Sequence, residues 1–306
     1  MADQTITESQ QPGGRVSYEL GRSNWGSPIP DIRRPASTVQ IPDNQLIDVI
    51  ILGDGFKSTS SFREQLVLWL QAFYTVPVYE LFAGAFRIRA LHTPSTEPAS
   101  TDRNSYYRCR LTDDGRGVSK EDQWWAADDA DGRTFRQRLW EAVDSFPDVN
   151  LRRYSADLDL GDNIAVSNRH VRDTYRNLVV SMLVRTANSP NVSGRTTGVP
   201  REPGHALNGR VAFGANSTHE FSHALGFLSD EYIDGRNSTN DRVNPDRPSV
   251  FTLSNLSYSD RDDSVPWLHL APTGRFRRAA GGIESPPVVG WLWLFADWTV
   301  RAWCSA

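Results

Sequence analysis

The chain has 306 residues, 39% of them hydrophobic, and a formal net charge of −4. This composition allows one large domain, or two modest ones, with a hydrophobic core. Acidic and basic residues are interspersed without a basic patch, so we expect no nucleic-acid partner. No apolar stretch is long enough to span a membrane, and the polar first ten residues lack the pattern of a signal peptide, so we expect no membrane partner.

The first part of the chain divides into a polar segment and a predicted strand. Residues 1–44 are rich in Pro, Gly and Ser, which favours a flexible N-terminal tail ahead of one domain over residues 45–306. Residues 46–52 form a continuous apolar run, typical of a buried central strand, and Asp54 and Gly55 after it favour a turn. We expect the Asp54 carboxylate to cap or brace the following segment and not to bind a metal.

Helices and strands then alternate along the chain. Apolar residues at helical or alternating spacing predict them, and Ser60 or Ser61 is the expected cap of the first helix. Residues 93–132, with a Trp pair as a packing anchor, and residues 187–207 are expected to be loops. The expected elements are a helix over residues 62–74, a strand over 85–91, a helix over 135–143 and strands over 178–184 and 210–214. This alternation predicts an α/β fold with a mixed, twisted sheet.

The segment from Ser217 to Gly226 contains the motif His-Glu-x-x-His. Ser217 is a good N-cap and Glu220 stands three residues later, as in a capping box, which predicts a helix that Gly226 ends or bends. Residues four apart lie on one face of a helix, so His219 and His223 can direct two imidazoles at one metal ion. Because only 6 of the 306 residues are histidine, this pairing is informative. The alternative is that both are ordinary surface residues and Glu220 is only a capping partner.

This spacing is that of a zinc hydrolase, in which two imidazoles hold Zn2+ and the adjacent Glu220 is the general base toward a zinc-activated water. A third protein ligand is needed. Metzincin peptidases place a His at the position of Ser229, and we favour Asp230, the next residue, as the ligand here. Glu231 is the alternative, followed by His269, and the possibility that both acids lie on the surface stays open.

The run from His219 to Tyr232 resembles the signature of the IgA-peptidase family, the igalysin branch of metzincin-like zinc metallopeptidases. Residues 48–56 resemble the family's early strand ending in Gly-Asp-Gly, and residues 289–293 its late Gly-Trp-Leu-Trp element. Ser222 stands where the family has Gly. The family's closing segment has a Cys followed by a Met. Cys304 matches that Cys but no Met follows it, so C-terminal truncation of the domain stays open.

The resemblance implies a metzincin-like fold, Zn2+ as cofactor and hydrolysis of peptide bonds in a protein or peptide substrate. It also implies an extracellular location. The first residues of this sequence do not have the pattern of a signal peptide that would direct such export. Tyr232, close to the motif, is the candidate hydrogen-bond donor to the oxyanion, and the alternative is that it packs beneath the helix. Cys109 and Cys304 are either a disulfide or two reduced thiols.

Two other functions stay open on this sequence. One is a catalytically inactive zinc-binding homologue or scaffold protein, and the other is a zinc hydrolase that acts on amides or esters other than peptides. Two acidic stretches, residues 128–132 and 234–246, are weaker candidates for a Ca2+ site. The first lacks the spaced Glu of an EF-hand, which favours a solvated acidic turn.

Overall fold

The computed structural model describes residues 6–20, 46–75, 79, 85–149, 151, 174–187, 192–204, 208–214, 218–226, 256–257, 277–278 and 288–289. By its internal contacts the chain divides into two compact units, whereas we expected one domain over residues 45–306. The first unit comprises Met1–Arg153 and Thr174–Ala224. The second comprises Tyr154–Asp173 and Leu225–Ala306.

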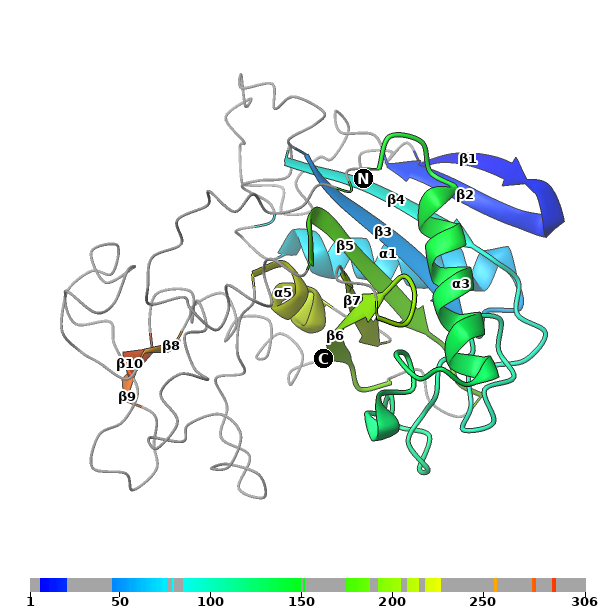
Figure 1. Cartoon of the computed structure of the whole chain (residues 1–306). Helices are drawn as coiled ribbons and strands as arrows, with labels where there is room; N and C mark the ends of the chain where they lie inside the picture. The colour runs from blue at the N-terminus through cyan, green and yellow to red at the C-terminus, as the bar shows by residue number, and fades with distance from the viewer. Residues whose placement is uncertain are drawn as a thin grey trace. The chain divides into compact units, whose positions relative to one another are not determined.

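The first unit is built on a seven-stranded mixed sheet (Figure 1). In spatial order its strands are β1 (Ile6–Gln11), β2 (Arg15–Leu20), β4 (Phe86–His92), β3 (Ile47–Asp54), β5 (Thr174–Val184), β7 (Asn208–Gly214) and β6 (Arg195–Pro200). The four central strands β4, β3, β5 and β7 are parallel, and the strands at the two edges pair antiparallel. The predicted mixed α/β class is therefore confirmed.

Strand β3 occupies the centre of the sheet, as the apolar run at residues 46–52 predicts. All of its residues after Ile47 are buried, because parallel neighbours flank it and helices cover both faces. The chain leaves the strand at Gly55, whose φ is 84°. A Cβ at Gly55 would lie 2.3 Å from the Arg185 carbonyl oxygen, so only glycine fits there. The turn predicted at Asp54 and Gly55 is confirmed.

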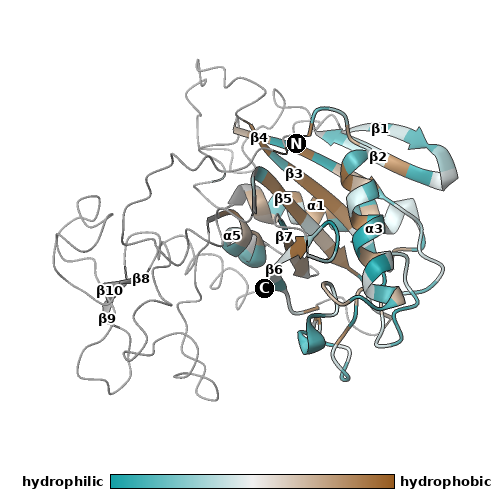
Figure 2. Ribbon diagram, in the orientation of Figure 1, coloured by the Kyte–Doolittle hydropathy of each residue, from teal (hydrophilic) through white to brown (hydrophobic). Residues whose placement is uncertain are grey.

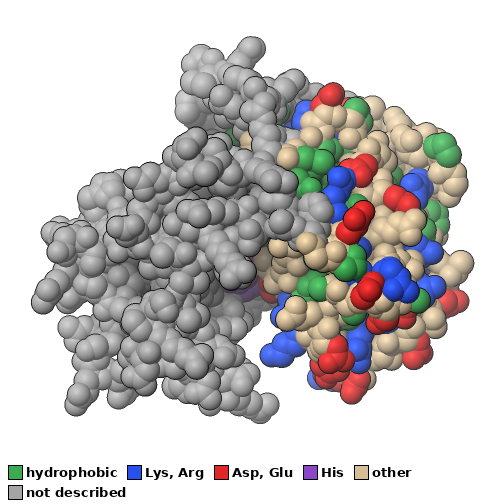
Figure 3. Space-filling view, viewed as in Figure 1, with side chains coloured by type: hydrophobic (Ala, Val, Ile, Leu, Met, Phe, Trp, Pro, Cys, Tyr) green, Lys and Arg blue, Asp and Glu red, His purple; other side chains and the backbone are tan. Residues whose placement is uncertain are grey.

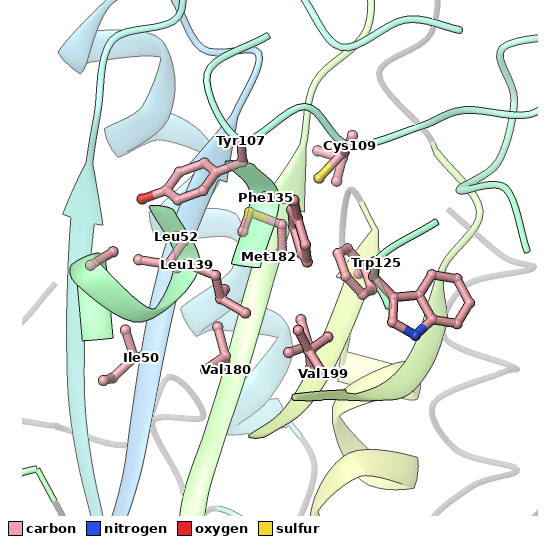
Figure 4. Packing of buried hydrophobic residues seen from close by; sticks show 14 of the residues in the cluster. Ile50, Leu52, Tyr107, Cys109, Trp125, Phe135, Leu139, Val180, Met182 and Val199 are labelled. Atoms are coloured by element: carbon pink, nitrogen blue, oxygen red, sulfur yellow. The ribbon is translucent and has the colours of Figure 1, made fainter. Parts of the chain in front are cut away.

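Helix α3 (Ala130–Asp144) covers one face of the sheet and α1 (Thr59–Thr75) the other (Figure 1). Alternate residues of the central strands face α3, and Figure 4 shows four of them against α3: Ile50, Leu52, Val180 and Met182. The Trp pair of the predicted loop, Trp124 and Trp125, joins the same core. Figure 2 shows the resulting pattern, with apolar central strands and a polar outer side of α3.

Both helices begin earlier in the chain than predicted, because other residues cap them. The Ser58 Oγ accepts a hydrogen bond from the Ser61 N–H at 3.2 Å, so the expectation that Ser60 or Ser61 caps α1 is wrong. Asp129 caps α3, and its side chain accepts from the Gly132 N–H. In each case the cap lies in a polar stretch that apolar periodicity does not mark.

The expected flexible tail over residues 1–44 does not hold for residues 6–20, which form the β1–β2 hairpin. Strand β2 pairs antiparallel with β4, and its alternate residues Val16 and Tyr18 are buried. The expectation of a loop over residues 187–207 is wrong in part as well. Strand β6 pairs along β7 as an edge strand, and it lacks a strong apolar alternation because an edge strand is only partly covered.

In the second unit, the described residues form a small antiparallel sheet in the order β8 (Leu256–Ser257), β10 (Val288–Val289) and β9 (Arg277–Arg278). None of the helices in the described part of the chain has the length and apolar character needed to cross a membrane. Acidic and basic side chains lie side by side on the described surface that Figure 3 shows.

Candidate functional site

Helix α5 (Thr218–Gly226) carries His219, Glu220 and His223 and begins shortly after β7 ends at Gly214. The motif therefore lies at the carboxyl end of a parallel strand, where open α/β sheets place their ligand sites (Figure 1). The fully buried Phe221 attaches the helix to the sheet. Its ring centroid lies 5.2 to 6.5 Å from those of four aromatic rings, Phe73, Tyr79, Trp69 and Phe86. Aromatic pairs in such edge-to-face geometry stabilise packing beyond the area they bury.

Two polar contacts fix the orientation of α5. The Tyr79 hydroxyl lies 2.6 Å from the Ser222 Oγ, in the middle of the motif. Burial raises the pKa of Tyr79, against the opposing effect of the Ser222 hydrogen bond, so its hydroxyl stays protonated. Near the C-terminal end of the helix, the buried Arg210 donates from Nη1 to the Ala224 carbonyl oxygen at 2.8 Å. A cation at the last carbonyls of a helix also interacts favourably with the helix dipole.

The imidazoles of His219 and His223 converge. Their Nε2 atoms are 2.9 Å apart, their ring centroids are 4.5 Å apart, and the ring planes meet at 88°. Two nitrogens bound to one tetrahedral Zn2+ at 2.0–2.1 Å would be about 3.3 Å apart. The pair therefore fits a shared metal ion with a small adjustment. The same separation also suits a hydrogen bond between one protonated and one bare ring nitrogen.

The half-buried Glu220 side chain lies against the start of β6. The Thr196 hydroxyl is 2.9 Å from Glu220 Oε2 and also contacts the Glu220 backbone carbonyl. A Cβ at Gly194 would lie 2.4 Å from Glu220 Cγ and 2.6 Å from the Phe213 carbonyl oxygen. The absence of a side chain at Gly194 is therefore what lets the Glu220 side chain lie over this strand.

Between these two residues, Arg195 faces the other side of β6. Its guanidinium carbon lies 4.9 Å from the centroid of the Trp125 ring, within the range of a cation–π interaction. Burial lowers the pKa of Arg195, and the charge of the nearby Glu220 opposes that shift. Arg195 thus places positive charge near the Glu220 carboxylate.

The remaining predicted site residues are not placed. Asp230, Glu231, Tyr232 and His269 lie outside the described residues, as does Ser217, the predicted N-cap. Among the described residues no three His, Cys, Asp or Glu side chains gather as a metal-binding group. The third ligand and the oxyanion donor therefore stay predictions.

Asp54 braces the fold. It is fully buried and accepts hydrogen bonds from the Ser105 hydroxyl at 2.7 Å, the Tyr107 N–H at 2.8 Å and the Cys109 N–H at 3.0 Å. The braced segment is residues 105–109, far along the chain and not directly after Asp54 as predicted. Cys109 is buried there, and Cys304 lies outside the described residues.

The acidic stretch at residues 128–132 is the N-terminal turn of α3. Asp129 caps the helix, Asp131 pairs with Arg108, and Asp128 pairs with Arg133 at 3.1 Å. These carboxylates are therefore engaged with helix N–H groups and arginines. The second stretch proposed for Ca2+, residues 234–246, lies outside the described residues.

Sequence reasoning did not connect four residues with the motif helix that they contact: Gly194, Thr196, Tyr79 and Arg210. Each is distant in sequence from its partner on α5, so no spacing within the chain links them. A glycine two residues before a threonine, in a segment assigned to a loop, is too weak a signal to select. The pairing of β6 with β7 brings Thr196, and Gly194 just before the strand, beside the helix.

No protein-family model matches the chain. A search of curated proteins also finds no match.

Proposed function

We propose that the protein is a zinc-dependent metallopeptidase, metzincin-like in fold and of the IgA-peptidase (igalysin) type, that acts on a protein or peptide substrate. The approach of the His219 and His223 Nε2 atoms to 2.9 Å is the observation that carries the proposal. The position of α5 after a parallel strand, with the Glu220 carboxylate between the two histidines in sequence, supports it further.

The roles of the residues follow from their chemistry. When bound, Zn2+ lowers the pKa of a water molecule and polarises a substrate carbonyl. His219 and His223 would hold the ion through Nε2, with Asp230 as the predicted third ligand. Glu220 would take a proton from the attacking water and return it to the leaving amine. Tyr232 is the predicted hydrogen-bond donor to the oxyanion.

Zinc stoichiometry tests the ligands. After dialysis against Zn2+ and then buffer, elemental analysis should find about one zinc per chain, and His219→Ala or His223→Ala should remove it, because two remaining ligands make an inadequate site. His170→Ala, which removes a histidine outside the motif, is the control and should keep the metal. Stoichiometric zinc in both motif variants would show that the motif is not the site.

Hydrolysis tests the catalytic role of Glu220. Glu220→Gln should keep zinc and lose roughly 10²- to 10⁴-fold in kcat on a peptide that the wild-type protein cleaves, because it removes the general base. Cleaved peptides would be identified by mass spectrometry of a peptide mixture. A zinc-loaded wild-type chain that cleaves nothing would favour the inactive homologue or scaffold. One that cleaves only simple amides or esters would favour the non-peptidase hydrolase.

Paired substitutions decide the third ligand. Asp230→Ala should lose zinc, and Asp230→Asn should bind it more weakly, because a neutral amide is a poorer ligand than a carboxylate. Glu231→Ala should keep it. The reverse pattern would assign Glu231, and zinc binding by both Ala variants would direct the search to His269.

A further inference from the structure

Gly194 and Thr196, at the beginning of the β6 segment, both lie against the Glu220 side chain. Gly194 directly precedes β6 and Thr196 is the second residue of that strand. They are two positions apart in extended chain and both approach Glu220, whereas Arg195 between them contacts Trp125 on the other side. Gly194 provides the space, since a Cβ there would lie 2.4 Å from Glu220 Cγ. Thr196 provides the polar contact, with its hydroxyl 2.9 Å from Glu220 Oε2.

The hydroxyl of Thr196 has two acceptors within reach and one hydrogen to donate. They are Glu220 Oε2, at 2.9 Å, and the Glu220 backbone carbonyl oxygen in the first part of α5, which is nearer at 2.5 Å. A carboxylate is the stronger acceptor because a charge-assisted hydrogen bond is about twice as strong as a neutral one. Among the described residues, the Glu220 carboxylate has its hydrogen-bond contact with Thr196, and this contact involves Oε2 and not Oε1.

We infer that Thr196 is the positioning residue of the Glu220 carboxylate, holding it by Oε2 against β6 so that Oε1 is left for proton transfer. The inference rests on the proposed function, because it assigns a role relative to the general base. It extends that function by making an edge strand, which no motif marks, part of the machinery that orients the base. Thr196 itself does not contact substrate or reacting atoms in this role.

Two substitutions at Thr196 separate the hydroxyl from the shape of the side chain. Thr196→Val replaces the hydroxyl by a methyl of similar size and should lower kcat roughly ten- to hundredfold, the loss expected for one hydrogen bond to a charged group. The KM and the zinc content should stay as in the wild type. Thr196→Ser keeps the hydroxyl and should stay within about threefold of the wild-type kcat.

Thr197→Val is the matched control on the same strand. Among the described residues, the Thr197 hydroxyl has one hydrogen-bond partner, the Gly198 carbonyl at 3.5 Å, and by strand alternation it faces away from Glu220. Its loss should leave kcat and zinc content unchanged. Wild-type kcat in Thr196→Val, or an equal loss in Thr196→Ser and Thr196→Val, would overturn the inference, because the hydroxyl would then not be what matters.

A structural measurement tests the inference without a substrate. In crystals of the full chain, the Thr196 Oγ1 to Glu220 Oε2 contact should be present in the wild type and in Thr196→Ser. In Thr196→Val the Glu220 side chain should leave β6 or occupy several rotamers. A wild-type crystal with Glu220 turned away from Thr196 overturns the inference whatever the activity.

The outcomes also separate this inference from the proposed function. Full activity in Glu220→Gln contradicts the proposed function itself. An inactive Glu220→Gln beside a fully active Thr196→Val contradicts only the role of Thr196. If the wild type cleaves no peptide, the crystal comparison still decides whether Thr196 holds the carboxylate.

Discussion

Asp54 and Glu220 both lie at the carboxyl ends of parallel strands, and the chain surrounds the two carboxylates differently. Asp54 ends β3, is 0% exposed, and receives three hydrogen bonds, two of them from backbone N–H groups. Glu220 lies on α5 after β7 and is half-buried, and within the described residues its carboxylate has one hydrogen-bond contact, from the Thr196 hydroxyl to Oε2. Both oxygens of the Asp54 carboxylate accept hydrogen bonds from the chain, whereas Oε1 of Glu220 accepts none from the described residues.

The difference shows how the two roles can be told apart. A fully hydrogen-bonded, buried carboxylate organises the loop that donates to it, and no atom is left for chemistry. Burial raises the pKa of Asp54, and its hydrogen bonds from Ser105, Tyr107 and Cys109 act in the opposite direction. A partly exposed carboxylate held at one oxygen is oriented but still accessible, which is what a general base requires.

Removing the Asp54 carboxylate should have the largest effect on stability. Asp54→Ala leaves three buried donors without an acceptor, each costing about 1–3 kcal/mol, so we expect a loss of about 4 kcal/mol in the free energy of unfolding. Glu220→Ala is the matched comparison and should cost about 1 kcal/mol or less. Urea unfolding followed by fluorescence measures both. Equal losses of unfolding free energy in the two variants would show that the Asp54 and Glu220 carboxylates do not differ in their structural role.

Crowding the Glu220 side chain should affect activity and stability together. Gly194→Ala places a Cβ 2.4 Å from Glu220 Cγ and 2.6 Å from a backbone oxygen, so the side chain and β6 must both shift. We expect a loss of about 1–3 kcal/mol in stability and of at least about tenfold in kcat, with zinc retained. Unfolding, elemental analysis and peptide cleavage measure the three quantities.

Gly198→Ala is the control for that variant, because the three atoms nearest to its Cβ would all belong to the Asn208 side chain, at 3.2 Å or more. It should keep most of the activity. If Gly194→Ala keeps the wild-type kcat, the close approach of β6 to Glu220 does not matter for function.

Loss of the Tyr79 hydroxyl should loosen the attachment of α5 to the rest of the unit, while the Asp54 and Glu220 carboxylates both stay in place. Tyr79→Phe deletes the 2.6 Å contact with Ser222 and should cost about 1 kcal/mol in unfolding free energy. Tyr106→Phe, which deletes a hydroxyl that accepts from Arg15, is the comparison. It should cost less, because the Tyr106 side chain is half-buried and partly open to water whereas Tyr79 is buried. A complete loss of zinc in Tyr79→Phe would show that the orientation of α5 depends on this one contact.

The smallest effect concerns His92, the buried residue that pairs in register with Gly53 beside Asp54. Burial lowers the pKa of His92 below its usual 6.5, and its hydrogen bond with the Phe56 carbonyl acts in the opposite direction. Its neutral form is therefore favoured in the folded state. The stability this contributes is present above the unfolded-state pKa and is lost as the pH falls through that value toward the lower, folded-state pKa.

We therefore expect wild-type stability to fall more steeply than that of His92→Gln between about pH 7 and about pH 5, the range in which histidine titrates. Urea unfolding at several pH values compares the two slopes. Parallel slopes would mean that His92 takes up its proton equally well in the folded and unfolded states.

Local patterns in the sequence were enough to predict several elements. The apolar run of β3, the alternation in β4 and the helical period of α1 and α3 each depend on residues within one short window. The placement of His219, Glu220 and His223 on one helix also follows from their spacing, because a helix brings residues four apart together. Element ends were less well predicted, since caps such as Ser58 and Asp129 are polar residues outside the periodic runs.

Only the tertiary structure revealed what holds these residues in place. Strand β6, the β1–β2 hairpin and the contacts of Thr196 and Tyr79 with α5 all join segments far apart in the chain. An edge strand needs only partial apolar cover. A hydroxyl or a glycine beside the Glu220 carboxylate cannot be told, from the sequence, from one in an ordinary loop. The sequence by itself therefore determined which side chains share the motif helix. The pairing of distant strands decided which neighbours orient them, because that pairing depends on contacts no local window contains.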